Sequence, residues 1–151
     1  GGWYGVLATL LLSRERMPIR GIRSFDIDSS ANELADKFNE NWVWRKWMFK
    51  AHTQDCNTLD YTSDKFGPTP DLVVNTSTEH FASDAWFSRI PKGTLVALES
   101  SNMPHDNHVS TTQDLKDFQS RFPLEKTFFL DSLSFTYPTW EFKRFLAIGI
   151  K

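Results

Sequence analysis

Helix-like and strand-like segments alternate along most of this chain, and no other feature of the sequence constrains the fold as strongly. Helical patterns occupy 6–11, 30–45, 81–87 and 110–122, and short apolar runs typical of strands occupy 21–27, 47–51, 71–75 and 93–99. The runs 71–75 and 93–99 are of the kind that is buried on both faces of a sheet. We therefore predict an α/β domain with a doubly wound, mostly parallel sheet and helices on both faces.

Local signals refine the ends of these segments. Ser30 to Glu33 and Ser110 to Gln113 resemble capping boxes, each with a serine as the N-cap of a helix. In the first of these helices one face is formed by Leu34, Phe38 and Trp42, and in the second Leu115 and Phe118 are expected to point inward. The β-rich runs 127–135 and 140–150, joined by a short turn, predict an antiparallel hairpin at the C-terminal end of the chain.

Length and composition indicate one domain and a small ligand. The 151 residues are 40% hydrophobic and include 13 Phe and 6 Trp, enough for a single core over residues 1–151. The net charge of −2 argues against nucleic acid as a partner, because phosphate binding needs an excess of Lys and Arg. The apolar start, Val6 to Leu12, is far shorter than the about 20 residues of a membrane span, so no membrane is expected.

The chain contains a single cysteine, Cys56, so it has no internal disulfide. This suits a reducing compartment, and we predict a cytoplasmic protein. The sequence opens inside a turn, Gly2 to Gly5, without a starting methionine, so we expect it to lack upstream residues.

Polar residues follow each predicted internal strand. Asp26 ends the first, Asp55 follows the second, the segment 75–80 follows the third, and Glu99 to Asn102 follows the fourth. Ligands of open parallel sheets bind at the carboxyl ends of the strands, so these residues are predicted to form one ligand site.

The order of these segments resembles that of class I S-adenosylmethionine-dependent methyltransferases over nearly the whole chain. Gly2 to Gly5 is similar to the second half of that family's glycine loop, and 25–31 is similar to its acidic strand end. The segments 54–56, 71–80 and 90–93 are similar to three later signatures, and the hairpin is similar to the family's ending. The strand that precedes the glycine loop in the family has no counterpart here, which predicts a half-built cofactor site and a sheet that is destabilised or completed by another chain. A homo-oligomer therefore stays open.

The resemblance implies a methyltransferase that binds S-adenosylmethionine and methylates a small-molecule acceptor. Asp26 would take the two ribose hydroxyls, Asp55 would accept from the adenine amine, and His80 beside Glu79 would be the base that receives the acceptor's proton. The residues that the resemblance assigns to the cofactor are Gly2, Gly5, Asp26, Ile27, Asp55, Cys56, Asn75 and Thr76.

Each of these residues also has an ordinary structural reading. Gly2 to Gly5 could be a plain turn, and either Asp26 or Asp28 could cap the next helix, with Asp28 the better cap. Asp55 could be a solvated loop acid, Asn75 could bond the backbone at a strand end, and Glu79 with His80 could be a capping and packing pair. Cys56 reads as a small filler rather than a nucleophile, because no basic residue lies near it in sequence.

His105 to His108 suggests a metal cluster at first sight. Adjacent loop residues with two His and no companion Cys are seldom a metal site, so no metal is predicted and a substrate-facing loop is preferred. Two other functions stay open: a non-catalytic S-adenosylmethionine-binding domain and a dinucleotide-binding oxidoreductase. The missing G-x-G-x-x-G pattern and the terminal hairpin count against the oxidoreductase.

Overall fold

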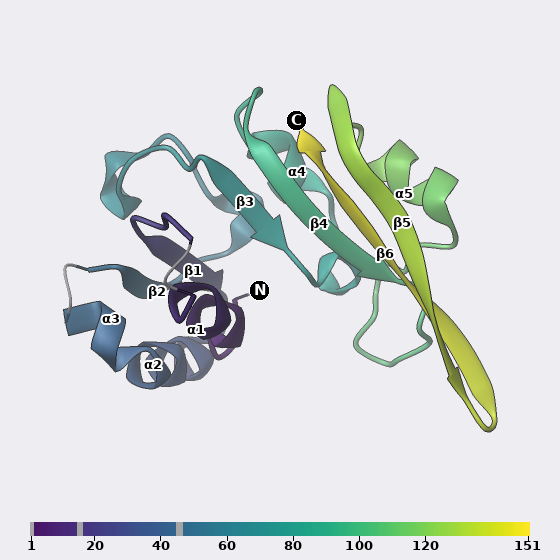
Figure 1. Ribbon diagram of the computed structural model, residues 1–151, viewed down its shortest axis with the longest axis horizontal. Coiled ribbons are helices and arrows are strands. Elements are labelled where there is room, and N and C mark those ends of the chain that lie inside the picture. Colours follow the sequence, from purple (N-terminus) through teal and green to yellow (C-terminus); the bar gives the residue numbers. More distant parts are fainter. Residues whose placement is uncertain (1, 15–16, 45–46) are drawn as a thin grey trace. The chain divides into compact units, whose positions relative to one another are not determined.

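A computed structural model describes residues 2–14, 17–44 and 47–151 of the protein (Figure 1). The chain divides into two compact units, Gly1–Leu59 and Asp60–Lys151, which we call unit 1 and unit 2. Each unit is an α/β structure with a sheet of its own. The single domain expected from the chain length stays a prediction.

Unit 1 consists of a two-stranded parallel sheet and short helices. Its helices are α1 (Val6–Leu12), α2 (Ser29–Phe38), α3 (Glu40–Trp44) and the 3₁₀ helix η1 (Cys56–Thr58), and its strands are β1 (Ile22–Asp26) and β2 (Phe49–Thr53). The strands run in register from Ile22 beside Phe49 to Asp26 beside Thr53, so both carboxyl ends lie at one edge. This arrangement confirms the two predicted strands and the helix between them.

The core of unit 1 is built from small residues around one ring. Ala8 of α1, Ala35 of α2 and Phe49 and Ala51 of β2 are buried together. Asn39 is also fully buried, and its side chain links the ends of two helices. Its Nδ2 donates to the carbonyl of Gly5 (3.2 Å) and its Oδ1 accepts from the Thr9 hydroxyl (2.9 Å).

Three expectations for this helical segment were wrong. The helix predicted over 30–45 is divided at Asn39, which is the C-cap of α2. The N-cap of α2 is Asp28 rather than Ser30, because the Asp28 carboxylate accepts from the two backbone N–H groups of Ser30 and Ala31. Leu34 and Phe38, which were grouped on one apolar face, are 50% and 59% exposed.

Unit 2 is built on a four-stranded mixed sheet with the order β3-β4-β6-β5. Its strands are β3 (Leu72–Asn75), β4 (Leu95–Ser101), β5 (Lys126–Tyr137) and β6 (Trp140–Ile150), and its helices are η2 (Asp64–Phe66), η3 (Thr78–His80), α4 (Ala85–Arg89) and α5 (Leu115–Arg121). β3 and β4 are parallel, whereas β6 runs antiparallel to both of its neighbours. The predicted C-terminal hairpin is confirmed, with a bulge between Thr127 and Phe129.

Helices α4 and α5 cover one face of this sheet. Val96 and Leu98 of β4 lie beside Gly149 and Ala147 of β6 on the covered face and are fully buried. The rings of Trp86, Phe87, Phe118 and Phe122 from the helical layer contact one another there. The aromatic residues of this layer form the core of unit 2 between the helices and the sheet.

An ion pair holds α4 against α5. The Arg121 guanidinium donates to both carboxylate oxygens of Asp84, at 3.1 and 2.8 Å, and to the carbonyl of Ser110 at 2.9 Å. The N-cap of α5 is Asp114, which accepts from the Asp117 N–H, so the capping box predicted at Ser110 was wrong. Phe118 is buried as predicted, and the helix ends at Phe122.

The predicted single sheet is the main correction. Within the described residues the strands form two sheets, and helices of the same unit lie against each of them. β3 was expected to be buried on both faces, but Leu72 and Val74 are exposed. Residues 2–14 and 17–20 contribute a turn and a helix but no strand.

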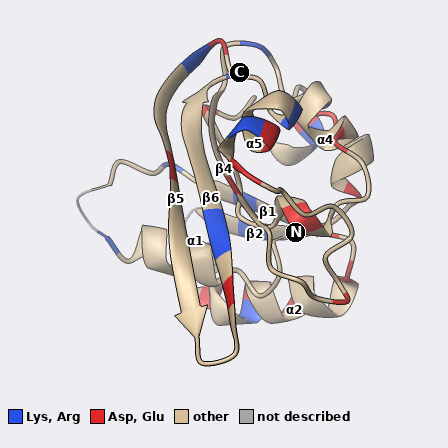
Figure 2. Ribbon diagram, turned by 90° about the vertical axis from the view of Figure 1, so that its right-hand side faces the viewer, with Lys and Arg blue, Asp and Glu red and all other residues tan. Residues whose placement is uncertain are grey.

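Charges of both signs are interspersed along the ribbon (Figure 2). The sign of the charge changes repeatedly within helices and along the hairpin, as expected for a net charge of −2. Among the described helices none is both long enough and apolar enough to cross a membrane. The cytoplasmic location stays a prediction.

Candidate functional site

The predicted glycine turn is tied to the carboxyl end of β1 in unit 1. The backbone N–H of Gly2 donates to the carbonyl of Phe25 at 2.6 Å, and the N–H of Trp3 donates to Oδ2 of Asp26 at 3.0 Å. The turn closes with a hydrogen bond from the Gly5 N–H to the Gly2 carbonyl at 3.1 Å, and α1 starts directly after it. The structure therefore brings the glycine turn and the strand-end acid into direct contact, although they are far apart in sequence.

Both glycines are required by close approach. Gly5 has φ of 69°, and a Cβ there would lie 2.7 Å from Nδ2 of the buried Asn39 and 3.1 Å from the Phe49 ring. A Cβ on Gly2 would overlap the Ser24 hydroxyl. The two glycines therefore let the turn pack directly against β1, β2 and Asn39, at positions where a side chain would collide.

Asp26 and Asp28 differ in their hydrogen bonds. Asp28 is confirmed as the helix cap. Oδ1 of Asp26 accepts from the Asp28 N–H at 3.0 Å, and Oδ2 accepts from Trp3. Because each carboxylate oxygen has two acceptor sites, both oxygens of Asp26 keep capacity for a further donor.

The end of β2 lies beside the end of β1. The N–H of Gln54 donates to the carbonyl of Asp26 at 3.0 Å, so the chain after β2 begins beside the end of β1. Asp55 caps η1 by accepting from the Asn57 N–H at 2.8 Å. Asp55 is therefore placed at the same edge of the sheet as Asp26, where the sequence predicted it.

Cys56 and Ile27 complete this corner of unit 1. Burial raises the pKa of the Cys56 thiol, and the nearby carboxylates of Asp55 and Asp26 also raise it. The thiol therefore stays protonated, which supports the reading of Cys56 as a filler. Ile27 is 75% exposed, so its side chain presents an apolar surface next to Asp26.

In unit 2 the residues after β3 fold back toward the end of β4. Oδ1 of Asn75 accepts from the Ser77 N–H at 3.0 Å, which is the ordinary strand-end role foreseen for it. Thr76 is exposed. The Thr78 hydroxyl donates to the carbonyl of Glu99 at 3.0 Å and so fixes η3 against β4.

Glu79 and His80 lie on η3 and contact the loop after β4. The Glu79 carbonyl accepts from the N–H groups of Val109 and Ser110, both at 3.0 Å. Nδ1 of His80 lies 3.0 Å from the carbonyl of Asn107. Because a carbonyl only accepts, Nδ1 carries the proton, and the neutral ring keeps its lone pair on Nε2.

The electrostatic setting of His80 favours this neutral ring. Partial burial lowers the pKa of the His80 imidazole, and the positive charge that His108 can carry acts in the same direction. The Glu79 carboxylate opposes the shift without reversing it. A neutral imidazole with a free Nε2 can accept a proton.

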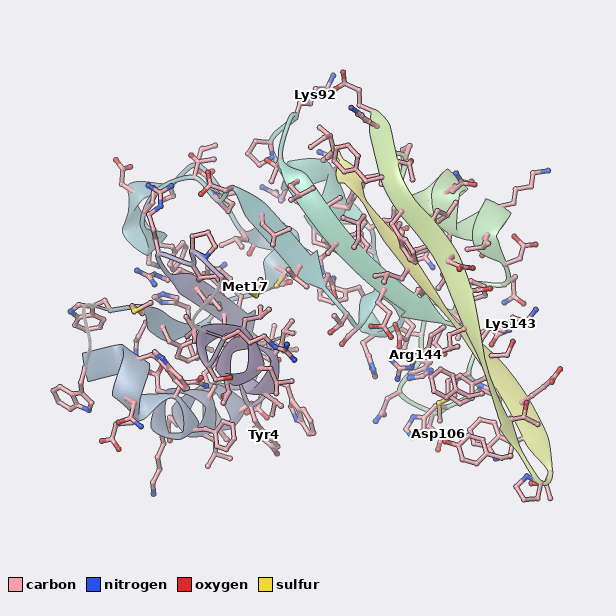
Figure 3. The ribbon with its side chains drawn as sticks, viewed as in Figure 1. Tyr4, Met17, Lys92, Asp106, Lys143 and Arg144 are labelled. Atoms are coloured by element: carbon pink, nitrogen blue, oxygen red, sulfur yellow. The ribbon has the colours of Figure 1, made fainter. Side chains whose placement is uncertain are left out.

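The loop that carries His105 to His108 lies at the carboxyl end of β4. Figure 3 labels Asp106 in this loop and Arg144 on β6 near that end of the sheet, whereas Lys92, before β4, lies at the opposite end. Nη1 of Arg144 donates to Oε1 of Glu99 at 2.5 Å across the two strands. The predicted strand-end segments 75–80 and 99–102 therefore share one edge of the unit 2 sheet.

The residue that sequence reasoning missed is His108. Its side chain is 8% exposed, its Nδ1 lies 2.8 Å from the carbonyl of Met103, and its ring meets the His80 ring edge-on with centroids 4.7 Å apart. The sequence placed His108 in a substrate-facing loop and gave no sign of a partner, because Glu79 and His80 belong to a different segment.

The fold is similar to that of solved methyltransferases. It matches a S-adenosylmethionine-dependent methyltransferase from Methanosarcina mazei with 14% identity and a TM-score of 0.67, over 100% of this chain and 89% of that one. It matches the YcgJ protein of Bacillus subtilis with 13% identity and a TM-score of 0.71, again over 100% and 89% of the two chains. The magnesium protoporphyrin IX methyltransferase ChlM from Synechocystis, solved with S-adenosylhomocysteine, matches with 12% identity and a TM-score of 0.62, over 99% and 71%.

No protein-family model matches the sequence, and no curated protein matches it either. The likeness is therefore one of fold. The chain has the fold of class I S-adenosylmethionine-dependent methyltransferases, which confirms the resemblance read from the order of its motifs.

Proposed function

We propose that this protein is a methyltransferase that uses S-adenosylmethionine to methylate a small-molecule acceptor. The observation that carries the proposal is the junction between the glycine turn and Asp26, where the Trp3 N–H donates to the carboxylate at 3.0 Å. A carboxylate that has spare acceptor sites and is held in place by a glycine turn suits a nucleoside with two vicinal hydroxyls. The methyltransferase fold supports the same reading.

The residues of unit 1 fit this cofactor. Asp26 is assigned to the ribose hydroxyls and Asp55 to the adenine amine, with the exposed Ile27 and the protonated Cys56 as apolar surface for the base. Gly2 and Gly5 are assigned to the cofactor through the turn that they form beside Asp26.

The acceptor's proton is assigned to His80. When bound, S-adenosylmethionine supplies a methyl group that is already activated on a sulfonium, so the chain must orient the acceptor and remove its proton. Nε2 of the neutral His80 ring takes that proton while Nδ1 donates to the Asn107 carbonyl. Glu79 lies next to His80 and stabilises the positive charge that forms.

Both the net charge of the chain and its structural likeness to ChlM support a small-molecule acceptor. The net charge of −2 lacks the basic excess that a nucleic-acid substrate would need. ChlM acts on magnesium protoporphyrin IX, a small molecule, and its fold covers 99% of this chain.

Thermal unfolding with added ligands tests the cofactor assignment. We expect S-adenosylmethionine and S-adenosylhomocysteine to raise the unfolding temperature and NAD to leave it unchanged, since a ligand at 100 times its Kd stabilises by about 2.7 kcal/mol. Asp26→Asn should weaken S-adenosylhomocysteine binding by about tenfold or more, because hydrogen bonds to a charged acceptor are lost. Glu33→Gln, on the exposed side of α2, is the matched control and should bind normally. Stabilisation by NAD alone would favour the dinucleotide-binding alternative.

Turnover separates an enzyme from a non-catalytic binding domain. With an acceptor found by screening, His80→Gln should lower kcat by about 10²- to 10⁴-fold and leave S-adenosylhomocysteine affinity unchanged. Binding without turnover on any acceptor would favour the non-catalytic reading.

A further inference from the structure

Three side chains of unit 2 are arranged as metal ligands. Glu79, His80 and His108 each offer one ligand atom, and these atoms lie within 4.8 Å of one another. The first two lie on η3, and the third lies in the loop after β4 that the Glu79 carbonyl holds through Val109 and Ser110. The group therefore rests on two segments that are fixed to each other by backbone hydrogen bonds.

Both imidazoles are oriented by backbone carbonyls. Nδ1 of His80 lies 3.0 Å from the Asn107 carbonyl, and Nδ1 of His108 lies 2.8 Å from the Met103 carbonyl. In each ring the proton is thereby placed on Nδ1 and the lone pair on Nε2. Histidines that bind metals are oriented in this way in proteins, with one nitrogen donating to a carbonyl or carboxylate and the other binding the ion.

Glu79 supplies an independent sign of a missing partner. The residue is 3% exposed, and its Oε2 is buried with no hydrogen-bond partner among the described residues. Oε1 lies 4.0 Å from Nε2 of His108, which is too long for a hydrogen bond. A buried carboxylate oxygen without a partner is costly, and a cation beside it would remove that cost.

We propose that Glu79, His80 and His108 bind a divalent transition-metal ion, of which Zn²⁺ is the best match. Two imidazoles and one carboxylate are a donor set that suits zinc, whereas Ca²⁺ and Mg²⁺ prefer oxygen ligands alone. Zinc–ligand distances of about 2.0–2.1 Å put tetrahedral ligand atoms about 3.4 Å apart, so small side-chain rotations would close the site. His80 is exposed, which leaves a fourth position open to water or another ligand.

Metal binding by itself does not depend on the proposed methyltransferase activity. A second consequence does rest on that proposed function. While Nε2 of His80 binds the ion it has no lone pair for a proton, so zinc and the acceptor's proton compete for one nitrogen. Zinc should then inhibit methyl transfer, and a chelator should restore it.

Titration calorimetry with ZnCl₂ on the full chain, carrying no affinity tag, tests the site. We expect one zinc per chain, and we expect His108→Gln and Glu79→Gln each to weaken binding by about 100-fold or more. Cys56→Ser and His105→Gln are matched controls, since they remove the lone thiol and the other imidazole of the same loop. Both controls should bind zinc as the unchanged protein does.

The absorption spectrum of bound Co²⁺ is a second measurement, and circular dichroism of the same variant shows whether it is still folded. Co²⁺ bound to this donor set should give visible absorption typical of low coordination, and His80→Gln should remove it while the far-UV circular dichroism is unchanged. No zinc binding to the unchanged protein, or equal weakening by His105→Gln and His108→Gln, would overturn the site. Zinc binding without inhibition of turnover would leave the site intact and refute His80 as the proton acceptor.

Discussion

The two polar strand ends of this protein are built in opposite ways. In unit 1 the carboxylates of Asp26, Asp28 and Asp55 all accept from backbone N–H groups. In unit 2 Glu79 is buried, and one of its oxygens lacks a partner among the described residues. The carboxylates of unit 1 are thus satisfied by backbone N–H groups, whereas the buried carboxylate of unit 2 is not fully satisfied by the described residues.

The polar residues of unit 1 are held by the backbone, whereas those of unit 2 include groups that can bind a proton or a metal ion. Backbone hydrogen bonds fix Asp26 and its neighbours in place and leave spare acceptor sites for a ligand's hydroxyls. The Nδ1 atoms of His80 and His108 lie at hydrogen-bond distance from backbone carbonyls, and one ligand atom each of Glu79, His80 and His108 lies within 4.8 Å of the others.

The largest effect is expected at the glycine turn of unit 1. Gly5→Ala should destabilise the protein by about 3 kcal/mol, because φ of 69° is unfavourable for alanine and the new Cβ would lie 2.7 Å from Asn39. Gly93→Ala in unit 2 is the matched control, since φ is 83° but nothing lies within 4 Å of the new Cβ. It should cost only about 1 kcal/mol. Urea unfolding measures both, and equal costs would show that the side chains packed around Gly5 can move to make room for a Cβ.

The ion pair between α4 and α5 should rank second. Arg121→Ala removes hydrogen bonds to the Asp84 carboxylate and to the Ser110 carbonyl, and we expect a loss of about 2 kcal/mol in the free energy of unfolding. Lys116→Ala on the exposed side of α5 should change it by less than about 0.5 kcal/mol. A similar small loss for both would mean that solvent already screens the Asp84 pair.

A smaller effect is expected at the cap of α2. Asp28→Ala should cost about 1 kcal/mol, because two backbone N–H groups at the helix start lose their acceptor. Ser30→Ala should be nearly neutral if Asp28 is the N-cap, and thermal unfolding compares the two. A larger loss of stability for Ser30→Ala than for Asp28→Ala would show that Ser30 is the N-cap, as the capping box in the sequence predicted.

The smallest effect concerns the reactivity of Cys56. Burial raises the pKa of its thiol, so at about pH 8 the native protein should contain less thiolate than an unfolded chain, whose thiol has a pKa of about 8.5. Alkylation by iodoacetamide should therefore be slower in native protein than in urea, and raising the pH should increase the native rate. Equal rates in both states would show that the thiol is not shielded.

Much of the fold could be predicted because its signals are local. The strand at Asp26, the strand after Trp47 and the C-terminal hairpin follow from short apolar runs with turn residues between them. The preference for Asp28 as the cap also held, since a cap bonds to N–H groups two or three residues away. The motif order was enough to indicate the methyltransferase fold.

Two kinds of error had a common cause: a short sequence pattern does not show what its residues will contact in the folded chain. Ser30 and Ser110 match the capping pattern, but Asp28 and Asp114 lie close by and have the backbone geometry that caps the helices. The run at 71–75 looks doubly buried, yet Leu72 and Val74 are exposed because burial depends on what covers a strand. The apolar pattern alone could not supply that information.

The sequence by itself determined the elements, their order and the acids at the strand ends, because helix periods, turns and caps act over a few residues. Only the tertiary structure decided that Trp3 donates to Asp26, that Asn39 joins two helices, and that His108 faces Glu79. These contacts join residues far apart in the chain, so packing and backbone hydrogen bonds between segments select them. The candidate metal site is of this second kind, and its missing signal in the sequence has that physical origin.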